Sequence, residues 1–247
     1  MVPFESSAPR IFHPGPLAPG TRLELPATAV PHLRALRRRA GSALVLFDGR
    51  GGEYSARLAH LERRAAVVSV EAFSPREAES PLAVTLVQGL AKGERMDFVV
   101  QKATELGVAR ILPVFTAHGA FRLPPERAAS RRAHWERVAA SACEQCGRNR
   151  LPVVETPAPL MDVWEQLPPG PGVVLQPGAG KALRGAGLSP GPLTLLVGPE
   201  GGLAEVELAE AARRGYLPVG LGPRVLRTET AAVAVLAALQ VLAGDMG

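Results

Sequence analysis

The chain has 247 residues and a formal net charge of +5, from 28 basic and 23 acidic residues. This length allows one large or two modest domains with a substantial core, and two cysteines are too few for a secreted disulfide scaffold. No apolar run approaches the roughly 20 residues of a membrane span, and the first ten residues lack a signal-peptide pattern. We therefore expect a cytoplasmic protein without a membrane partner.

Positive charge is concentrated in two segments. Residues 1–72 contain ten Arg and six acids, residues 120–150 contain seven Arg and three acids, and residues 151–247 have a net charge of −3. Clustered positive charge favours a polyanionic partner such as nucleic acid. A generally Arg-rich composition, with only three Lys, would produce the same excess. Charge alone therefore leaves both interpretations open.

In chain order, residues 1–72 predict a small β-rich module. A short basic helix is expected over Pro31–Arg39, followed by an apolar strand from Ser42 that a turn at Asp48 closes. Two more strands are expected over Tyr54–Leu61 and Ala65–Phe73. The polar, proline-bounded stretch at residues 73–81 reads as a linker to a second domain.

Strands and helices alternate in residues 82–247, which predicts an α/β domain with a parallel sheet. Glycines directly after several of the helical stretches mark where those helices end. The expected strands are Leu82–Leu90, Ile111–Phe115, Val173–Gln176, Leu193–Val197 and Leu217–Leu221. The expected helices are Glu94–Leu106, Pro124–Cys146, Ala204–Arg214 and the apolar Thr230–Leu242.

Three polar or glycine-rich loops follow predicted strands. They are Gln176–Gly178, Gly198–Gly202 and the longer Leu221–Thr230. Ligands of open parallel sheets bind at the carboxyl ends of strands, and glycine lets a ligand approach the backbone. Each loop alone could be a tight turn, and Thr228 or Glu229 could be a helix cap. Three loops at one sheet edge favour a binding site more than any one of them.

Four stretches together resemble one family. Leu196–Gly202 followed by Leu221–Ala231, with Lys92–Gly107 and Glu144–Arg148, closely resembles the ribosomal RNA small subunit methyltransferase E family, in order along the chain. The resemblance implies an N-terminal PUA-like β-barrel and a C-terminal SPOUT α/β domain with a deep trefoil knot. It also implies a homodimer that uses S-adenosylmethionine to make 3-methyluridine in 16S rRNA, with the assembled small ribosomal subunit as the favoured substrate.

The resemblance implies site residues. Methylating N3 of uridine requires removal of its proton and stabilisation of the resulting negative charge. The expected catalytic cations are Arg227, then Arg95 and Arg148. Glu229 is the candidate base, although it could instead complement the dipole of the last helix. The expected cofactor-binding residues are Leu175, Gln176, Gly198, Glu200, Gly202, Leu221, Gly222, Leu226 and Thr230.

RNA contacts are expected from two Arg clusters, with a solvated helix face as the alternative for each. The clusters are Arg34, Arg37, Arg38 and Arg39, and Arg131 and Arg132. No metal is required by the chemistry. Cys143 and Cys146, one helical turn apart, lack a second pair for zinc, and Gly178–Ala182 departs from the phosphate-binding P-loop pattern.

Two other functions stay open from the sequence. The same fold could methylate another RNA target, or the chain could be a non-catalytic RNA-binding ribosome assembly factor. Identification of the methylated nucleoside separates the first from N3 methylation of uridine. RNA binding without methyl transfer, unaffected by Arg227→Ala, is the signature of the second.

Overall fold

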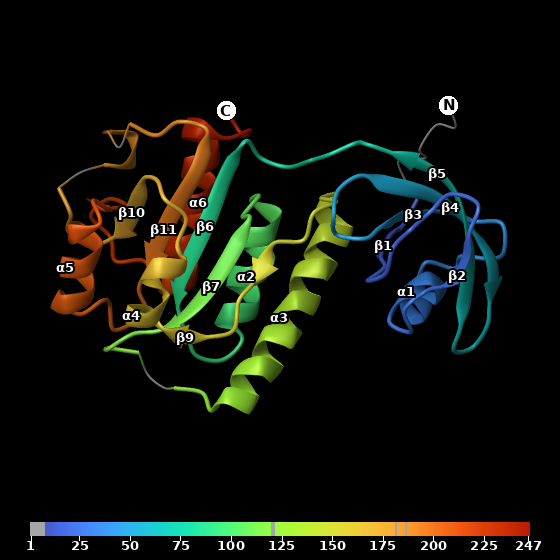
Figure 1. Cartoon of the computed structure of the whole chain (residues 1–247), viewed down its shortest axis with the longest axis horizontal. Helices are drawn as coiled ribbons and strands as arrows, with labels where there is room; N and C mark the ends of the chain where they lie inside the picture. Colours follow the sequence, from blue (N-terminus) through green and yellow to red (C-terminus); the bar gives the residue numbers. More distant parts are fainter. Residues whose placement is uncertain (1–7, 120–121, 181, 186) are drawn as a thin grey trace. The chain divides into compact units, whose positions relative to one another are not determined.

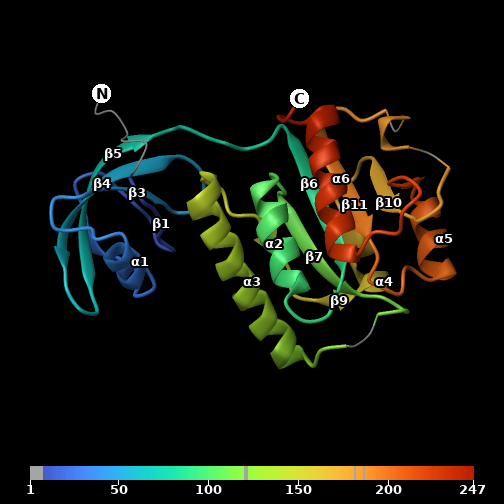
Figure 2. The same cartoon turned by 180° about the vertical axis from the view of Figure 1, so that it is seen from behind.

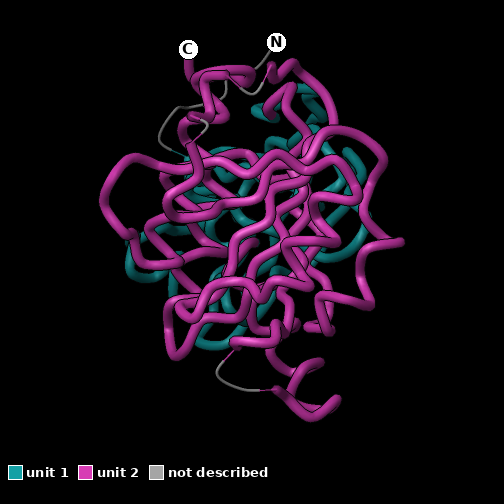
Figure 3. The backbone as a smooth tube through the Cα atoms, turned by 90° about the vertical axis from the view of Figure 1, so that its left-hand side faces the viewer, with its two compact units in different colours: residues 1–79, 140–151 teal, residues 80–139, 152–247 magenta. Residues whose placement is uncertain are grey.

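The computed structural model describes residues 8–119, 122–180, 182–185 and 187–247. The chain divides into two compact units, residues 1–79 with 140–151 and residues 80–139 with 152–247 (Figure 3). The predicted domains, 1–72 and 82–247 with a linker at 73–81, remain a prediction about independent folding. The compact units differ from the predicted domains in one respect: residues 140–151 belong to the unit that contains the N-terminal part of the chain.

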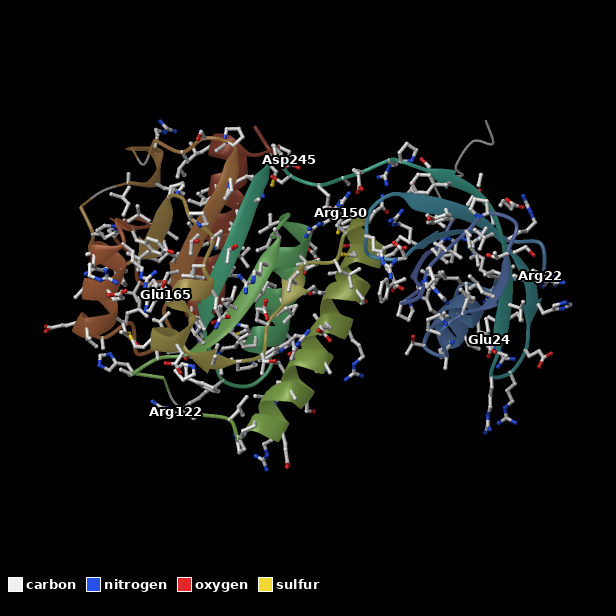
Figure 4. The ribbon with its side chains drawn as sticks, in the orientation of Figure 1. Arg22, Glu24, Arg122, Arg150, Glu165 and Asp245 are labelled. Atoms are coloured by element: carbon white, nitrogen blue, oxygen red, sulfur yellow. The ribbon has the colours of Figure 1, made fainter. Side chains whose placement is uncertain are left out.

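The first unit is a five-stranded, barrel-like sheet in the order β1-β3-β4-β5-β2 (Figure 1). Strands β1 and β3 are parallel and the other pairs are antiparallel. Alternate side chains of the sheet pack with Val30 and Leu33 of helix α1 into one core. On β2, Arg22 and Glu24 are exposed while Leu23 between them packs against that core (Figure 4). The elements are β1 (Arg10–Phe12), β2 (Arg22–Glu24), α1 (Ala29–Ala35), β3 (Ala43–Phe47), β4 (Glu53–Leu61) and β5 (Ala66–Ser74).

Helix α1 is shorter than the predicted helix Pro31–Arg39 and begins two residues earlier. It ends because Arg37 adopts a left-handed backbone with φ of 54°. The amide of Arg37 bonds the carbonyl of Arg34, and the amide of Arg38 bonds that of Leu33. These two bonds form a Schellman motif, which is normally built on glycine. No glycine marks this helix end in the sequence, because position 37 is an arginine.

The second unit is a seven-stranded sheet in the order β12-β10-β11-β6-β7-β8, with β9 also pairing β7. Every pair in it is parallel, as predicted. The strands are β6 (Leu82–Gly89), β7 (Arg110–Phe115), β8 (Val153–Val154), β9 (Ala158–Pro159), β10 (Gly172–Leu175), β11 (Gly191–Val197) and β12 (Leu217–Val219). The helices are α2 (Arg95–Glu105), α3 (Pro125–Cys146), α4 (Leu160–Val163), α5 (Glu205–Arg213) and α6 (Thr228–Ala243), with 3-10 turns at Trp164–Gln166 and Leu183–Gly185.

Helices cover both faces of this sheet. Helices α2 and α6 lie side by side on one face (Figure 2), where α6 contributes Val235 and Leu239 to a large apolar core. A second core on the other face includes Trp164 and Tyr216, whose rings meet edge to face. Because strand side chains alternate, Leu86 enters the first core and Val87 the second. Burial on both faces explains why the strands read as continuous apolar runs.

The trefoil knot stays a prediction. Strand β10 lies between β11 and β12, so the chain passes from β11 to β12 across the neighbouring strand. In the part of the chain that the structure describes, no helix combines the length and apolarity needed to cross a membrane.

Candidate functional site

A cavity of about 570 Å³ lies at the carboxyl ends of β10, β11 and β12. Its size falls within the roughly 300–1,000 Å³ usual for small-molecule sites. The three loops predicted from the sequence form it, together with apolar side chains such as Leu203 and Leu208 of the β11–α5 region. Backbone segments 198–200 and 221–228 therefore face the same space from two sides. Such a cavity suits a ligand with a flat apolar part and several polar groups.

Thr228 ties two of the loops together. Its hydroxyl donates to the carbonyl of Gly198 at 2.7 Å and accepts from Nε2 of Gln88 at 2.9 Å. Thr228 and Gln88 are both buried. The structure thus gives Thr228 a different role from the side-chain cap that the sequence left open, since α6 has no side-chain cap bond at Arg227.

Two other close contacts set the position of the Gly198–Gly202 loop. A Cβ on Gly89 would lie 2.5 Å from the backbone nitrogen of Pro199, so only glycine fits where β6 ends. The buried carboxylate of Glu207 accepts hydrogen bonds from the amides of Ala117 and Ala204. Glu207 therefore fixes the start of α5 and the loop after β7 at the same time.

The structure brings together eight of the nine predicted cofactor residues. Around the cavity lie Leu175, Gln176, Gly198, Glu200, Gly202, Leu221, Gly222 and Leu226. The ninth, Thr230, is exposed on the first turn of α6 and is not among the lining residues. Contact of these residues with a cofactor stays a prediction.

A second, smaller cavity of about 400 Å³ adjoins the first and shares Glu200 with it. Its other lining residues are Lys92, Arg95, His118 and Gly201. The guanidinium of Arg95 donates to Glu200 at 2.5 Å, and its Nε lies 3.7 Å from Oε1 of Glu229. Although partial burial opposes it, hydrogen bonds from the amide of Glu200 itself, from Arg95 and from the Lys92 backbone lower the pKa of Glu200.

The four predicted catalytic residues have different surroundings. Arg227 is exposed, lines the larger cavity and has no ion pair within the described ranges. Glu229 has one buried carboxylate oxygen, Oε2, to which no described residue donates. Arg148 belongs to the first unit, where its side chain is 5% exposed and its guanidinium donates to Glu79 at 2.6 Å.

The predicted RNA-binding arginines are exposed, except for Arg38, which is half-buried. Arg34 is on α1, and Arg37 to Arg39 follow it as the turn that ends the helix. Arg131 and Arg132 are exposed on α3, where Arg132 pairs with Glu136 at 2.9 Å.

Sequence reasoning missed the residues that hold the loops or complete the second cavity. Gln88, Glu207 and His118 stand alone in the sequence, and none belongs to a pattern that would mark it. Lys92 lies in a matched stretch but was not singled out. Cys143 and Cys146, on the last turn of α3, form no disulfide. Among the described residues no group of His, Cys, Asp or Glu is arranged to hold a metal ion, and Lys181 of the rejected P-loop pattern lies outside them.

Comparisons with known proteins agree with this geometry. A family model described as an RNA methyltransferase domain matches residues 78–240, and one described as an RNA methyltransferase PUA domain matches residues 25–71. The chain is similar to ribosomal RNA small subunit methyltransferase E of Mycobacterium tuberculosis, with 35% identity over 85% of this chain and 83% of that protein.

Two solved structures are also similar over nearly their whole length. Ribosomal RNA small subunit methyltransferase E from Neisseria gonorrhoeae, bound to S-adenosylmethionine, is 38% identical with a TM-score of 0.89, over 97% of this chain and 100% of that one. A methyltransferase from Legionella pneumophila, in complex with the same cofactor, is 37% identical with a TM-score of 0.91, over 96% and 99%.

Proposed function

Because this chain belongs to the ribosomal RNA small subunit methyltransferase E family, we propose that it methylates N3 of one uridine of 16S rRNA with S-adenosylmethionine. The observation that carries the proposal is the cavity at the ends of three parallel strands, with Arg227 at its wall and Glu229 just beyond. We further propose that the substrate is the assembled small ribosomal subunit, that the protein acts in the cytoplasm and that it is a homodimer.

The cavity fits the cofactor. Leu175, Leu221 and Leu226 offer apolar surface for an adenine ring, and backbone groups of the three loops offer hydrogen bonds to its polar edge. Gly202 and Gly222 adopt φ of 73° and 82°, a left-handed backbone that glycine accepts without strain, so these loops can follow the cavity wall. When bound, S-adenosylmethionine supplies an electrophilic methyl group.

The chain's own residues then manage the charge on uracil. As N3 bonds to the methyl carbon, the N3–H proton must leave, and negative charge builds on the two flanking carbonyl oxygens. Arg227 is exposed at the cavity wall, so its guanidinium is free to stabilise that charge. Arg227 is the residue directly before α6, so the helix start fixes the position of its backbone.

Glu229 is the proposed proton acceptor. Its Oε2 is buried and no described residue donates to it, so this oxygen is available to accept a proton, and the Nε of Arg95 lies 3.7 Å from Oε1. Helix-dipole stabilisation is the competing role, since Glu229 is in the first turn of α6. Arg148 has the weakest geometric support as a catalytic group, because Glu79 already binds its guanidinium.

Methyl-labelled S-adenosylmethionine tests the proposal. The protein is incubated with small ribosomal subunits from a strain that lacks this gene, and the RNA is digested to nucleosides. We expect label in 3-methyluridine, and Arg227→Ala should lower the rate at least 100-fold, as loss of one oxyanion donor does. Arg213→Ala, an exposed arginine on α5 outside the cavity, is the matched control.

Other outcomes of this assay discriminate the alternatives. Label in a different nucleoside would retain the enzyme class and change the target. RNA binding with no label, unaffected by Arg227→Ala, would identify a non-catalytic assembly factor.

A further inference from the structure

The second cavity is built from three separate loops that meet beside the cofactor cavity. Lys92 comes from the loop after β6, His118 from the loop after β7, and Glu200 and Gly201 from the loop after β11. Gly201 allows the close approach, since a Cβ there would lie 2.7 Å from the carbonyl oxygen of His118. Arg95, the first residue of α2, completes the lining.

This cavity already binds an oxyanion from the protein itself. The carboxylate of Glu200 accepts a hydrogen bond of 2.5 Å from the Arg95 guanidinium. A guanidinium is also a common donor to phosphate oxygens. The Glu200 side chain is 34% exposed, so its pair with Arg95 is accessible to a ligand. Another oxyanion can therefore compete with it for the same donors.

Lys92 adds a cation that Glu200 does not use. Its side chain is exposed and has no hydrogen bond or ion pair within the described part of the chain. One turn along α2 from Arg95, Phe98 is 44% exposed. Cationic side chains near an exposed aromatic ring are typical of surfaces that bind single-stranded RNA.

We propose that this cavity binds a phosphodiester group of the RNA substrate, which displaces the Glu200 carboxylate from Arg95. The inference rests on the proposed function only in taking RNA as the substrate. It assigns Lys92 and Arg95 to the RNA backbone and leaves Arg227 to the uracil ring. Because Glu200 lines both cavities, RNA and S-adenosylmethionine should each change the affinity of the other by the same factor.

Binding of unmethylated small ribosomal subunits, measured over a series of salt concentrations without cofactor, tests the proposal. We expect Lys92→Ala to weaken binding severalfold and to reduce the slope of log affinity against log salt by roughly 0.7–0.9, the value for one lost phosphate contact. Lys92→Arg should restore both. Lys102→Ala is the matched control, because Lys102 lies outside the second cavity, on α2, and pairs with Glu105 at 2.8 Å.

Glu200→Gln gives the opposite readout. If Glu200 competes with RNA for Arg95, Glu200→Gln should tighten binding of the subunit at low salt. If Glu200 is only structural, the substitution should weaken that binding or leave it unchanged. Thermal unfolding of each variant confirms that the fold is retained.

Two results would overturn the inference. One is an unchanged affinity and salt slope in Lys92→Ala. The other is weaker S-adenosylmethionine binding by Lys92→Ala with RNA binding unaffected, which would assign the cavity to the cofactor's carboxylate. The proposed function can fail independently of this inference. In that case the wild-type protein would bind subunits, and Lys92→Ala would reduce the salt slope, but no 3-methyluridine would form.

Discussion

Arg37 is the clearest case of a single residue held against its own preference. Among the described residues it is the one non-glycine with positive φ, 54°, in a position where helices usually end with glycine. A left-handed backbone costs a non-glycine residue roughly 1–2 kcal/mol. Strain of this kind persists at functional positions, which agrees with the predicted contact between Arg37 and RNA.

We therefore expect Arg37→Gly to raise stability and lower RNA affinity. The free energy of unfolding should increase by about 0.5–1 kcal/mol, since glycine adopts this backbone freely but costs more entropy on folding. Urea unfolding measures the first effect, and the affinity for small ribosomal subunits measures the second. Arg39→Ala, at an exposed neighbour without positive φ, should lower affinity without a gain in stability. Unchanged RNA affinity in Arg37→Gly would remove Arg37 from the RNA surface.

At the scale of elements, the cavity depends on a bond between two loops that are 30 residues apart. The Thr228 hydroxyl donates a hydrogen bond to the carbonyl of Gly198 and accepts one from Gln88. All three polar groups lie in the core or at its edge. Thr228→Val keeps the shape of the side chain and removes both bonds. Buried polar groups left without partners cost roughly 1–3 kcal/mol each.

We expect Thr228→Val to lower the free energy of unfolding by about 2–3 kcal/mol. It should also weaken S-adenosylmethionine binding, because the hydrogen bond that holds the two loops of the cavity together is lost. Thermal unfolding and titration calorimetry measure these effects. Thr230→Val, two residues along the same helix but exposed, should change stability by less than about 0.5 kcal/mol. If Thr230→Val also weakened S-adenosylmethionine binding, that result would support the predicted contact of Thr230 with the cofactor, although Thr230 does not line the cavity.

The elements that sequence reasoning predicted are those with strong local signals. Helices α2 and α5 end at Gly107 and Gly215, and both glycines have φ of 78°. Strands β8 and β9 have two residues each, too short for any hydrophobic period, and were missed. The three glycine-rich loops were found for the same reason as the helix ends. Gln88 was not, because its partner Thr228 is 140 residues away in the sequence.

At the scale of the molecule, residues 140–151 belong to the first unit, although the residues on either side of them along the chain belong to the second. Sequence order alone would assign them to the second unit. This segment follows the second unit's part of α3, yet it is bound within the first unit. Its Glu144 accepts from the amide of Phe12 at 2.9 Å, and Asn149 accepts from Arg10 at 2.5 Å. Burial raises the pKa of Glu144 despite that hydrogen bond. These contacts give residues 1–79 partners that no fragment ending there would possess.

The pair Arg148–Glu79 is the most buried ionic link of this segment, with side chains 5% and 21% exposed. Glu79→Ala leaves the guanidinium in the protein interior without its carboxylate. Because Glu79 is partly exposed, we expect a loss of about 3 kcal/mol, the lower end for a broken buried pair. Glu71→Ala, which breaks the exposed pair with Arg57, should cost less than about 1 kcal/mol.

Substitutions in the Arg148–Glu79 pair also distinguish a structural role of Arg148 from a catalytic one. If Arg148 holds the segment in place, Arg148→Met and Glu79→Ala should both lower methyl transfer only in proportion to the fraction of protein that is folded. If Arg148 instead acts on the substrate, Arg148→Met should abolish methyl transfer at temperatures where the variant is fully folded. We expect the first result, because a guanidinium bound by Glu79 has to break that pair before it can reach a substrate.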